Sequence, residues 1–94
     1  METEKQLFNF AKKLCAKNKV GIYKMHCESK NGFPDLMLIY EGEIMFIELK
    51  SPNGKGRLSE IQKVRINELH NFGAEVYVID CPKVLEDVIT EFTN

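Results

Sequence analysis

The sequence predicts one domain of the α/β (α+β) class, in which helices flank a mixed central β-sheet. Three segments, at about 4–17, 60–72 and 82–92, carry apolar residues at helical spacing, and four shorter apolar runs have the length and composition of strands. The predicted order is α-β-β-β-α-β-α, for which a sheet covered by helices is the natural packing. Ninety-four residues without repeats or linkers fit a single domain, 1–94.

The first helix and strand follow from local signals. Thr3 and Gln6 have the spacing of a capping box, and the apolar residues that follow them recur with helical periodicity to about residue 17. The segment 20–26 contains β-forming residues and predicts a strand. Residues 29–32, Ser-Lys-Asn-Gly, predict a loop.

Two apolar runs, 35–40 and 44–49, flank Glu41-Gly42-Glu43 and predict a β-hairpin. Both runs are apolar on both faces, which is typical of strands in the centre of a sheet. A turn centred on Glu41 and Gly42 pairs Tyr40 with Glu43. The same register continues along the strands and places Asp35 directly opposite Glu48.

The second half of the chain predicts a loop, a helix, a strand and a last helix. Residues 51–56 are rich in glycine, Ser59 and Gln62 form a second capping box, and Gly73 provides a left-handed helix end. A strand is expected over 74–79, and Pro82 begins the last helix. Its apolar residues form one broad stripe: Val84, Leu85, Val88, Ile89 and Phe92.

Charged residues interrupt the hairpin where apolar ones are expected. Side chains alternate along a strand, so Glu48 and Lys50 lie on one face, and directly opposed residues such as Asp35 and Glu48 have Cβ atoms about 4.5–5.5 Å apart. Two carboxylates this close raise one pKa unless a divalent cation neutralises both. A structural interpretation stays open, because a Glu-x-Lys pair on a strand is common and Asp35 follows Pro34, where a strand can begin.

Two further polar residues are candidates for the same site. Glu4 precedes Leu7, Phe8 and Ala11 by three, four and seven residues and therefore shares their helix face. Gln62 lies on one helix face with Ile66 and Leu69. Each also has a structural interpretation, Glu4 as an acid in the first turn of a helix and Gln62 as the capping partner of Ser59.

Composition sets limits on the function. The chain is 44% hydrophobic and 29% charged with a net charge of −1, as in an ordinary globular protein. Residues from 75 onward carry five acids and one base. The rest of the chain can therefore present a basic face although the net charge is close to zero. The sequence shows no membrane-spanning run or secretion signal, and its odd set of Cys15, Cys27 and Cys81 predicts reduced thiols in the cytoplasm.

Several short motifs together resemble the VRR-NUC nucleases, a branch of the PD-(D/E)XK superfamily. They are Gly32-Phe33-Pro34-Asp35, Phe46-Ile47-Glu48-Leu49-Lys50, Gly54-Lys55, Leu58-Ser59-x-x-Gln62 and Leu69-x-x-x-Gly73-Ala74-x-Val76. The resemblance implies a restriction-endonuclease-like core, with Mg²⁺ or Mn²⁺ bound by Asp35, Glu48 and the Leu49 backbone carbonyl. It further implies that Lys50 is the catalytic lysine. Glu4 matches the glutamate of the family's first helix and is a further candidate metal ligand. Gln62 matches the family's glutamine that follows the Glu-x-Lys strand.

The resemblance also implies a function. It predicts a metal-dependent endonuclease that cuts branched DNA such as a Holliday junction, as a homodimer of the stand-alone viral or phage type, in the host cytoplasm if phage-encoded. The loop bases Lys30, Lys55 and Arg57 are candidates for phosphate binding, and His26 and His70 for auxiliary roles. Two alternatives are a non-catalytic nucleic-acid-binding module and an interaction protein that assembles through its last helix.

Overall fold

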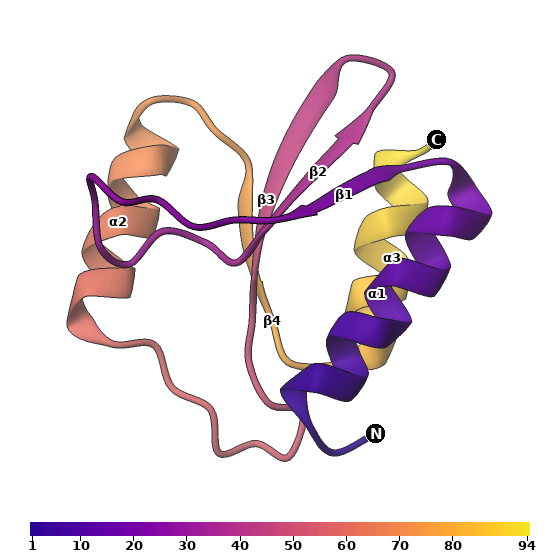
Figure 1. The fold of residues 1–94 in the computed structure, drawn as a ribbon, viewed down its shortest axis with the longest axis horizontal. Coiled ribbons are helices and arrows are strands. Elements are labelled where there is room, and N and C mark those ends of the chain that lie inside the picture. The colour runs from indigo at the N-terminus through magenta and orange to yellow at the C-terminus, as the bar shows by residue number, and fades with distance from the viewer.

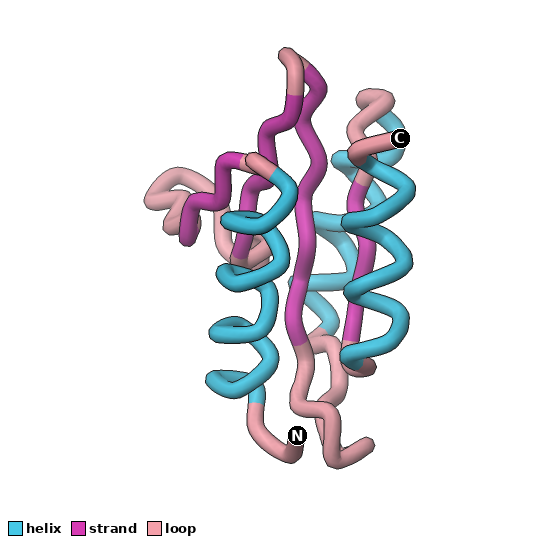
Figure 2. Tube along the Cα trace, turned by 90° about the vertical axis from the view of Figure 1, so that its right-hand side faces the viewer, coloured by secondary structure: helices cyan, strands magenta, loops and turns pink.

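The computed structural model describes residues 1–94 and has three layers (Figure 1, Figure 2). Helices α1 (Glu4–Asn18) and α3 (Pro82–Phe92) cover one face of a four-stranded sheet, and α2 (Glu60–Asn71) lies on the other side. The strands are β1 (Gly21–Lys24), β2 (Leu36–Tyr40), β3 (Glu43–Leu49) and β4 (Val76–Ile79). The predicted fold class and element order are confirmed.

The sheet has the order β1-β2-β3-β4, so the hairpin β2–β3 is central as expected. The first three strands are antiparallel, and β4 runs parallel to β3. Tyr40 pairs with Glu43, and the register continues to Leu36 opposite Ile47, as the sequence predicted. Glu41 and Gly42 have φ values of 48° and 83°, which are those of the tight hairpin turn that matches strand twist.

The ends of α2 follow the predicted signals. Ser59 accepts a hydrogen bond from the backbone N–H of Gln62, and the Gln62 side chain accepts one from the N–H of Ser59. At the other end Gly73 has φ +89°, and Ala74 donates its N–H to the Leu69 carbonyl at 2.9 Å. Both ends of the helix therefore satisfy backbone groups that would otherwise lack partners.

Two strands are shorter than the sequence predicted, and one residue of the predicted apolar stripe of the last helix is exposed. The strand expected over 20–26 spans only 21–24. It starts after Val20 because the N–H of Val20 closes α1 on the Cys15 carbonyl at 2.8 Å. The strand expected over 74–79 begins at Val76, since Ala74 takes part in the end of α2. Val84 is 45% exposed, because it lies one helical step of about 100° away from the buried line of Leu85 and Ile89.

The core lies between the sheet and the α1–α3 layer. Its buried residues come from both helices, from β2, β3 and β4, and from the connection between α1 and β1: Leu7, Ala11, Cys15, Val20, Leu36, Leu38, Met45, Ile47, Leu49, Ile79, Leu85 and Ile89. All three cysteines are free thiols. None of the helices combines the length and the apolar character that crossing a bilayer requires.

Candidate active site

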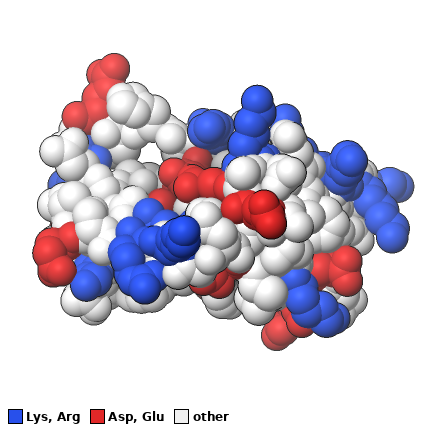
Figure 3. Space-filling model, turned by 90° about the horizontal axis from the view of Figure 1, so that it is seen from below, with Lys and Arg blue, Asp and Glu red and all other residues white.

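Four of the predicted site residues lie together at the end of the sheet where β3 finishes and α1 begins (Figure 1): Asp35, Glu48, Lys50 and Gln62. Asp35 immediately precedes β2, and Glu48 lies one residue before the end of β3. Leu36 of β2 pairs with Ile47 of β3, so the next pair along these two strands is Asp35 opposite Glu48. Seen from this end, acidic side chains lie in the middle of the molecular surface with basic side chains on both sides (Figure 3).

Glu48 is the one charged residue in the buried set, at 2% exposure. Its Oε2 accepts a hydrogen bond from Gln62 Nε2 at 3.1 Å and forms an ion pair with Lys50 Nζ at 3.3 Å. Its Oε1 is buried and has no hydrogen-bond partner. A buried carboxylate oxygen without a donor is costly in a fold, so this atom marks a place suited to a cation.

Burial raises the pKa of Glu48 from its ordinary 4.5 to about 7, and the negative charge of Asp35 adds to the rise. The ammonium group of Lys50 lowers the pKa of Glu48, but not enough to offset these two effects. The sequence predicted that one of the two opposed carboxyl groups would have a raised pKa. The structure identifies it as Glu48, because Glu48 is the more deeply buried of the two.

Asp35 is held beside the end of β3 by the backbone. Its Oδ2 accepts a hydrogen bond from the N–H of Leu49 at 3.2 Å. The peptide units on either side of Leu49 therefore lie next to the carboxylate pair. Carboxylate and carbonyl oxygens are the ligands that Mg²⁺ prefers, so this donor set fits a hard divalent cation.

Gln62 connects the charged groups of the site. Its Oε1 accepts hydrogen bonds from Lys50 Nζ at 3.0 Å and from the N–H of Ser59 at 2.9 Å, while its Nε2 donates to Glu48. One Gln62 amide therefore caps α2 and also contacts Glu48 and Lys50, and its functional role stays a prediction. Gly56 completes this packing: a Cβ there would lie 3.0 Å from Lys50 Cβ.

Glu4 is exposed at the start of α1 and lines a cavity of about 400 Å³ together with Asp35 and Leu49. The structure has no group of three or more His, Cys, Asp or Glu side chains that could hold a metal ion. Glu4 therefore lies on the wall of the cavity and outside the immediate carboxylate pair.

The same cavity is lined by Lys5, Lys12 and Lys24, which the sequence reasoning did not single out. The seven-residue spacing of Lys5 and Lys12, which puts both on one helix face, was the available signal.

The bases and histidines that the sequence suggested lie in different settings. Lys30 pairs with Glu68 of α2 at 3.2 Å, and Arg57 donates to the carbonyls of its own loop. Lys55 is exposed in the same loop. His26 is exposed, and the ring of His70 hydrogen-bonds the Val76 carbonyl at 3.1 Å. The hydrogen bond of His70 thus ties α2 to β4 and is directed away from the carboxylate pair.

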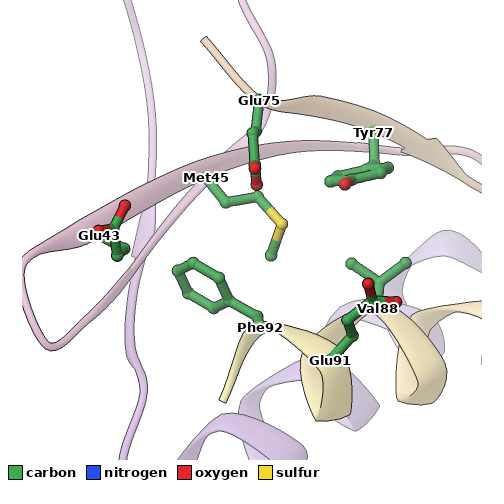
Figure 4. Close-up of a pocket in the computed structure, with 7 residues that line it drawn as sticks. All are labelled: Glu43, Met45, Glu75, Tyr77, Val88, Glu91 and Phe92. Carbon is green, nitrogen blue, oxygen red and sulfur yellow. The ribbon is translucent and has the colours of Figure 1, made fainter. Parts of the chain in front are cut away.

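A second cavity, of about 290 Å³, lies between α3 and the start of β3, away from the carboxylate pair (Figure 4). Its charged lining residues are all acidic: Glu43, Glu75 and Glu91. Apolar side chains of Met45, Tyr77, Val88 and Phe92 form the rest of the wall. Because this surface repels phosphate groups, it is unsuited to nucleic acid.

Comparisons with known proteins give a family match and a structure of similar fold. The VRR-NUC domain family matches residues 2–81 of the chain. A solved structure described as "VRR_NUC domain" superposes with a TM-score of 0.84 at 23% sequence identity, covering 98% of this chain and 99% of that one. A comparison with curated protein sequences gives no significant match. The similar structure supports the fold, and the family match covers all the residues described above as the site.

Proposed function

Because this chain belongs to the VRR-NUC domain family, whose domains are of the nuclease type, we propose that it is a divalent-metal-dependent endonuclease that hydrolyses DNA phosphodiester bonds. In this proposal Asp35, Glu48 and Lys50 form the signature of the PD-(D/E)XK superfamily. The observation that carries the proposal is Glu48: a carboxylate with 2% exposure, one oxygen without a partner, and Lys50 at 3.3 Å.

Asp35, Glu48 and the Leu49 carbonyl would hold the ion, Mg²⁺ or Mn²⁺, and Glu4 would act through water from the wall of the cavity that Asp35 lines. Two protein carboxylates are a common ligand set for Mg²⁺, which usually keeps several of its waters. When bound, the ion stabilises negative charge on the phosphate and makes a bound water more acidic.

Lys50 contributes a positive charge at a fixed position. Gln62 and Glu48 hold its ammonium group at 3.0 Å and 3.3 Å, so the charge does not have to be ordered when the substrate arrives. Lys50 orients the attacking water or offsets the negative charge that grows on the phosphate in the transition state. An arginine is not equivalent here, because a compact point charge fits between two carboxylates better than a planar guanidinium does.

The proposed substrate is branched DNA such as a Holliday junction, and the proposed active form is a homodimer. A two-fold dimer presents two identical sites, as two symmetric cuts in a four-way junction require. Apolar side chains available for an interface include Phe72, at 83% exposure, and Val64, at 56%. The loop bases Lys30, Lys55 and Arg57 are proposed to contact DNA phosphates. The proposed place of action is the cytoplasm, which is that of the host cell if the protein is phage-encoded.

Substitution of the catalytic lysine tests the proposal directly. We expect Lys50→Ala to lower DNA cleavage at least about 100-fold while the protein stays folded, because a preorganised charge at the reacting phosphate is lost. Lys63→Ala is the control, since Lys63 is an exposed lysine of α2 paired with Glu60. Cleavage is measured on supercoiled plasmid with Mn²⁺ and with EDTA. Full activity of Lys50→Ala refutes the assignment.

Substrate preference is tested by incubating the protein with duplex, flap, splayed-arm and four-way DNA, with and without Mn²⁺, beside Glu48→Ala. We expect metal-dependent cutting that is fastest on the four-way substrate and absent in Glu48→Ala. DNA binding without any cutting would instead assign the chain as a non-catalytic nucleic-acid-binding module.

A further inference from the structure

The cavity beside the carboxylate pair carries an unusual concentration of positive charge. Helix α1 contributes Lys5 and Lys12 to its wall, and Lys24 extends into it from the end of β1. The cavity also reaches Asp35 and Leu49, two of the three candidate metal ligands, while Glu48 lies outside its lining. Of its acidic lining residues, Asp35 belongs to the carboxylate pair and Glu4 lies at the start of α1.

These lysines have no acidic partner. The five ion pairs of the structure involve Lys30, Lys50, Lys63, Arg65 and Lys83, and none of the lysines of the cavity. The neighbouring lysines of α1 and of its C-terminal end also form no ion pair: Lys13, Lys17 and Lys19. An exposed base without a partner keeps its charge available for a ligand.

Phe8 brings two of these charges together. The ammonium group of Lys12 lies 4.8 Å from the centre of the Phe8 ring, and that of Lys24 lies 5.1 Å from it. Phe8 is partly buried against the core, so the ring is a fixed platform between α1 and β1. Two like charges gathered at one ring repel each other, and an anion placed between them relieves that repulsion.

The spacing of the lysines fits a polyanion better than a single ion. Lys5 and Lys12 are seven residues apart, which is about 10 Å along a helix. One strand of B-DNA places a phosphate every ~3.4 Å along its axis, so this distance corresponds to roughly three nucleotides. Asn9 lies between the two lysines on the same wall and adds an uncharged donor.

We propose that Lys5, Asn9, Lys12 and Lys24 bind the phosphates of the DNA strand next to the phosphate being cut, and so direct that strand across Asp35 and Glu48. This inference rests on the proposed nuclease function and assigns the DNA track of the same site. It places the main track on α1 and β1, whereas the loop base Lys30 is occupied by Glu68. The acidic cavity at the other end of β3 repels a strand that approaches from there.

The test removes charge while keeping the side-chain stems that pack on Phe8. The double variant Lys12→Gln and Lys24→Gln is compared with Lys13→Gln and Lys17→Gln, which makes the same charge change on exposed parts of α1 outside the cavity. Binding of a fluorescein-labelled DNA duplex is measured by anisotropy in EDTA over a range of salt concentrations. The double variant Lys12→Arg and Lys24→Arg keeps the charge.

We expect the Lys12 and Lys24 glutamine pair to weaken binding at least about tenfold and to lower the slope of log K against log salt by about 2, because two phosphate contacts are lost. The Lys13 and Lys17 pair should change the affinity less than about threefold, and the arginine pair should retain it. Equal losses in the two glutamine pairs, or no binding by the unsubstituted protein, overturn the proposal.

Cleavage with Mn²⁺ separates this proposal from the nuclease assignment. In the glutamine pair we expect KM to rise with kcat nearly unchanged, since contacts to phosphates that do not themselves react contribute uniform binding. Unchanged KM in an active enzyme overturns the DNA track and leaves the nuclease. If the unsubstituted protein cuts no DNA, and only the Lys12 and Lys24 glutamine pair loses DNA binding, the DNA track is supported and the nuclease assignment is rejected. Far-UV circular dichroism of each variant verifies folding.

Discussion

The two faces of strand β3 have opposite roles. Met45, Ile47 and Leu49 point into the layer of α1 and α3 and are at most 2% exposed. On the other face, Ile44 is 49% exposed, while Glu48 is as deeply buried as the core residues and Lys50 retains 16% side-chain exposure. One face of a single strand therefore lowers the free energy of the fold, and the other holds charges whose burial raises it.

This contrast shows how so small a domain can maintain a costly site. A side chain such as Ile47 contributes about 2–3 kcal/mol through burial, whereas the burial of Glu48 costs free energy and raises its pKa to about 7. The core face fixes the position of β3, and because side chains alternate, it also fixes where Glu48 points. Three substitutions test the comparison, from the largest effect to the smallest.

Truncating a side chain on the buried face of β3 should have the largest effect on stability. We expect Ile47→Ala to lower the free energy of unfolding by about 2–5 kcal/mol, because it leaves a cavity in a close-packed core. Ile44→Ala, on the exposed side of the same strand, should cost less than about 1 kcal/mol. Urea denaturation measures both values. Equal losses at the two positions would show that the faces do not differ.

Neutralising the buried charge should act in the opposite direction. The pKa of Glu48 is raised in the folded state, so the folded protein binds more protons than the unfolded one between about pH 4.5 and 7. Stability of the metal-free protein therefore falls as the pH rises through that window. We expect Glu48→Gln in EDTA to be more stable than the unsubstituted protein at pH 8, by on the order of 2 kcal/mol, with a much smaller gain at pH 4.5.

The matched control for this change is Glu43→Gln, at an exposed position of the same strand, which should leave stability nearly unchanged at both pH values. We also expect Mn²⁺ to raise the melting temperature of the unsubstituted protein at pH 8 and not that of Glu48→Gln. A stability gain that is the same at pH 4.5 and pH 8 would contradict the role of a buried charge.

The smallest effect should come from Gln62, whose two roles can be separated. Gln62→Glu keeps a residue suited to the capping box but replaces the donor to Glu48 with a carboxylate. We expect kcat/KM for DNA cleavage to fall about tenfold, with the helix content unchanged by circular dichroism. Gln6→Glu makes the same change in the capping box of α1, where the side chain bonds only the backbone of residues 2 and 3, and should leave cleavage unaffected.

Local signals predicted much of the fold and part of the site. The turn at Glu41 and Gly42 set the hairpin register, and that register is sufficient to place Asp35 opposite Glu48. The capping boxes located the starts of α1 and α2. Contacts between segments distant in the sequence were not predictable in this way. The pairing of Lys30 with Glu68 and the parallel addition of β4 to β3 are examples.

The sequence by itself determined the order of the elements and the opposition of two carboxylates, because caps, turns and strand alternation act over a few residues. Only the tertiary structure decided that Glu48 is buried, that Gln62 joins it to Lys50, and that lysines of α1 and β1 share one cavity with Asp35. The burial of Glu48 arises when segments far apart in the chain pack together and exclude water, and that exclusion raises the pKa of its carboxyl group. The lysine cavity arises because the same packing places α1 beside β1.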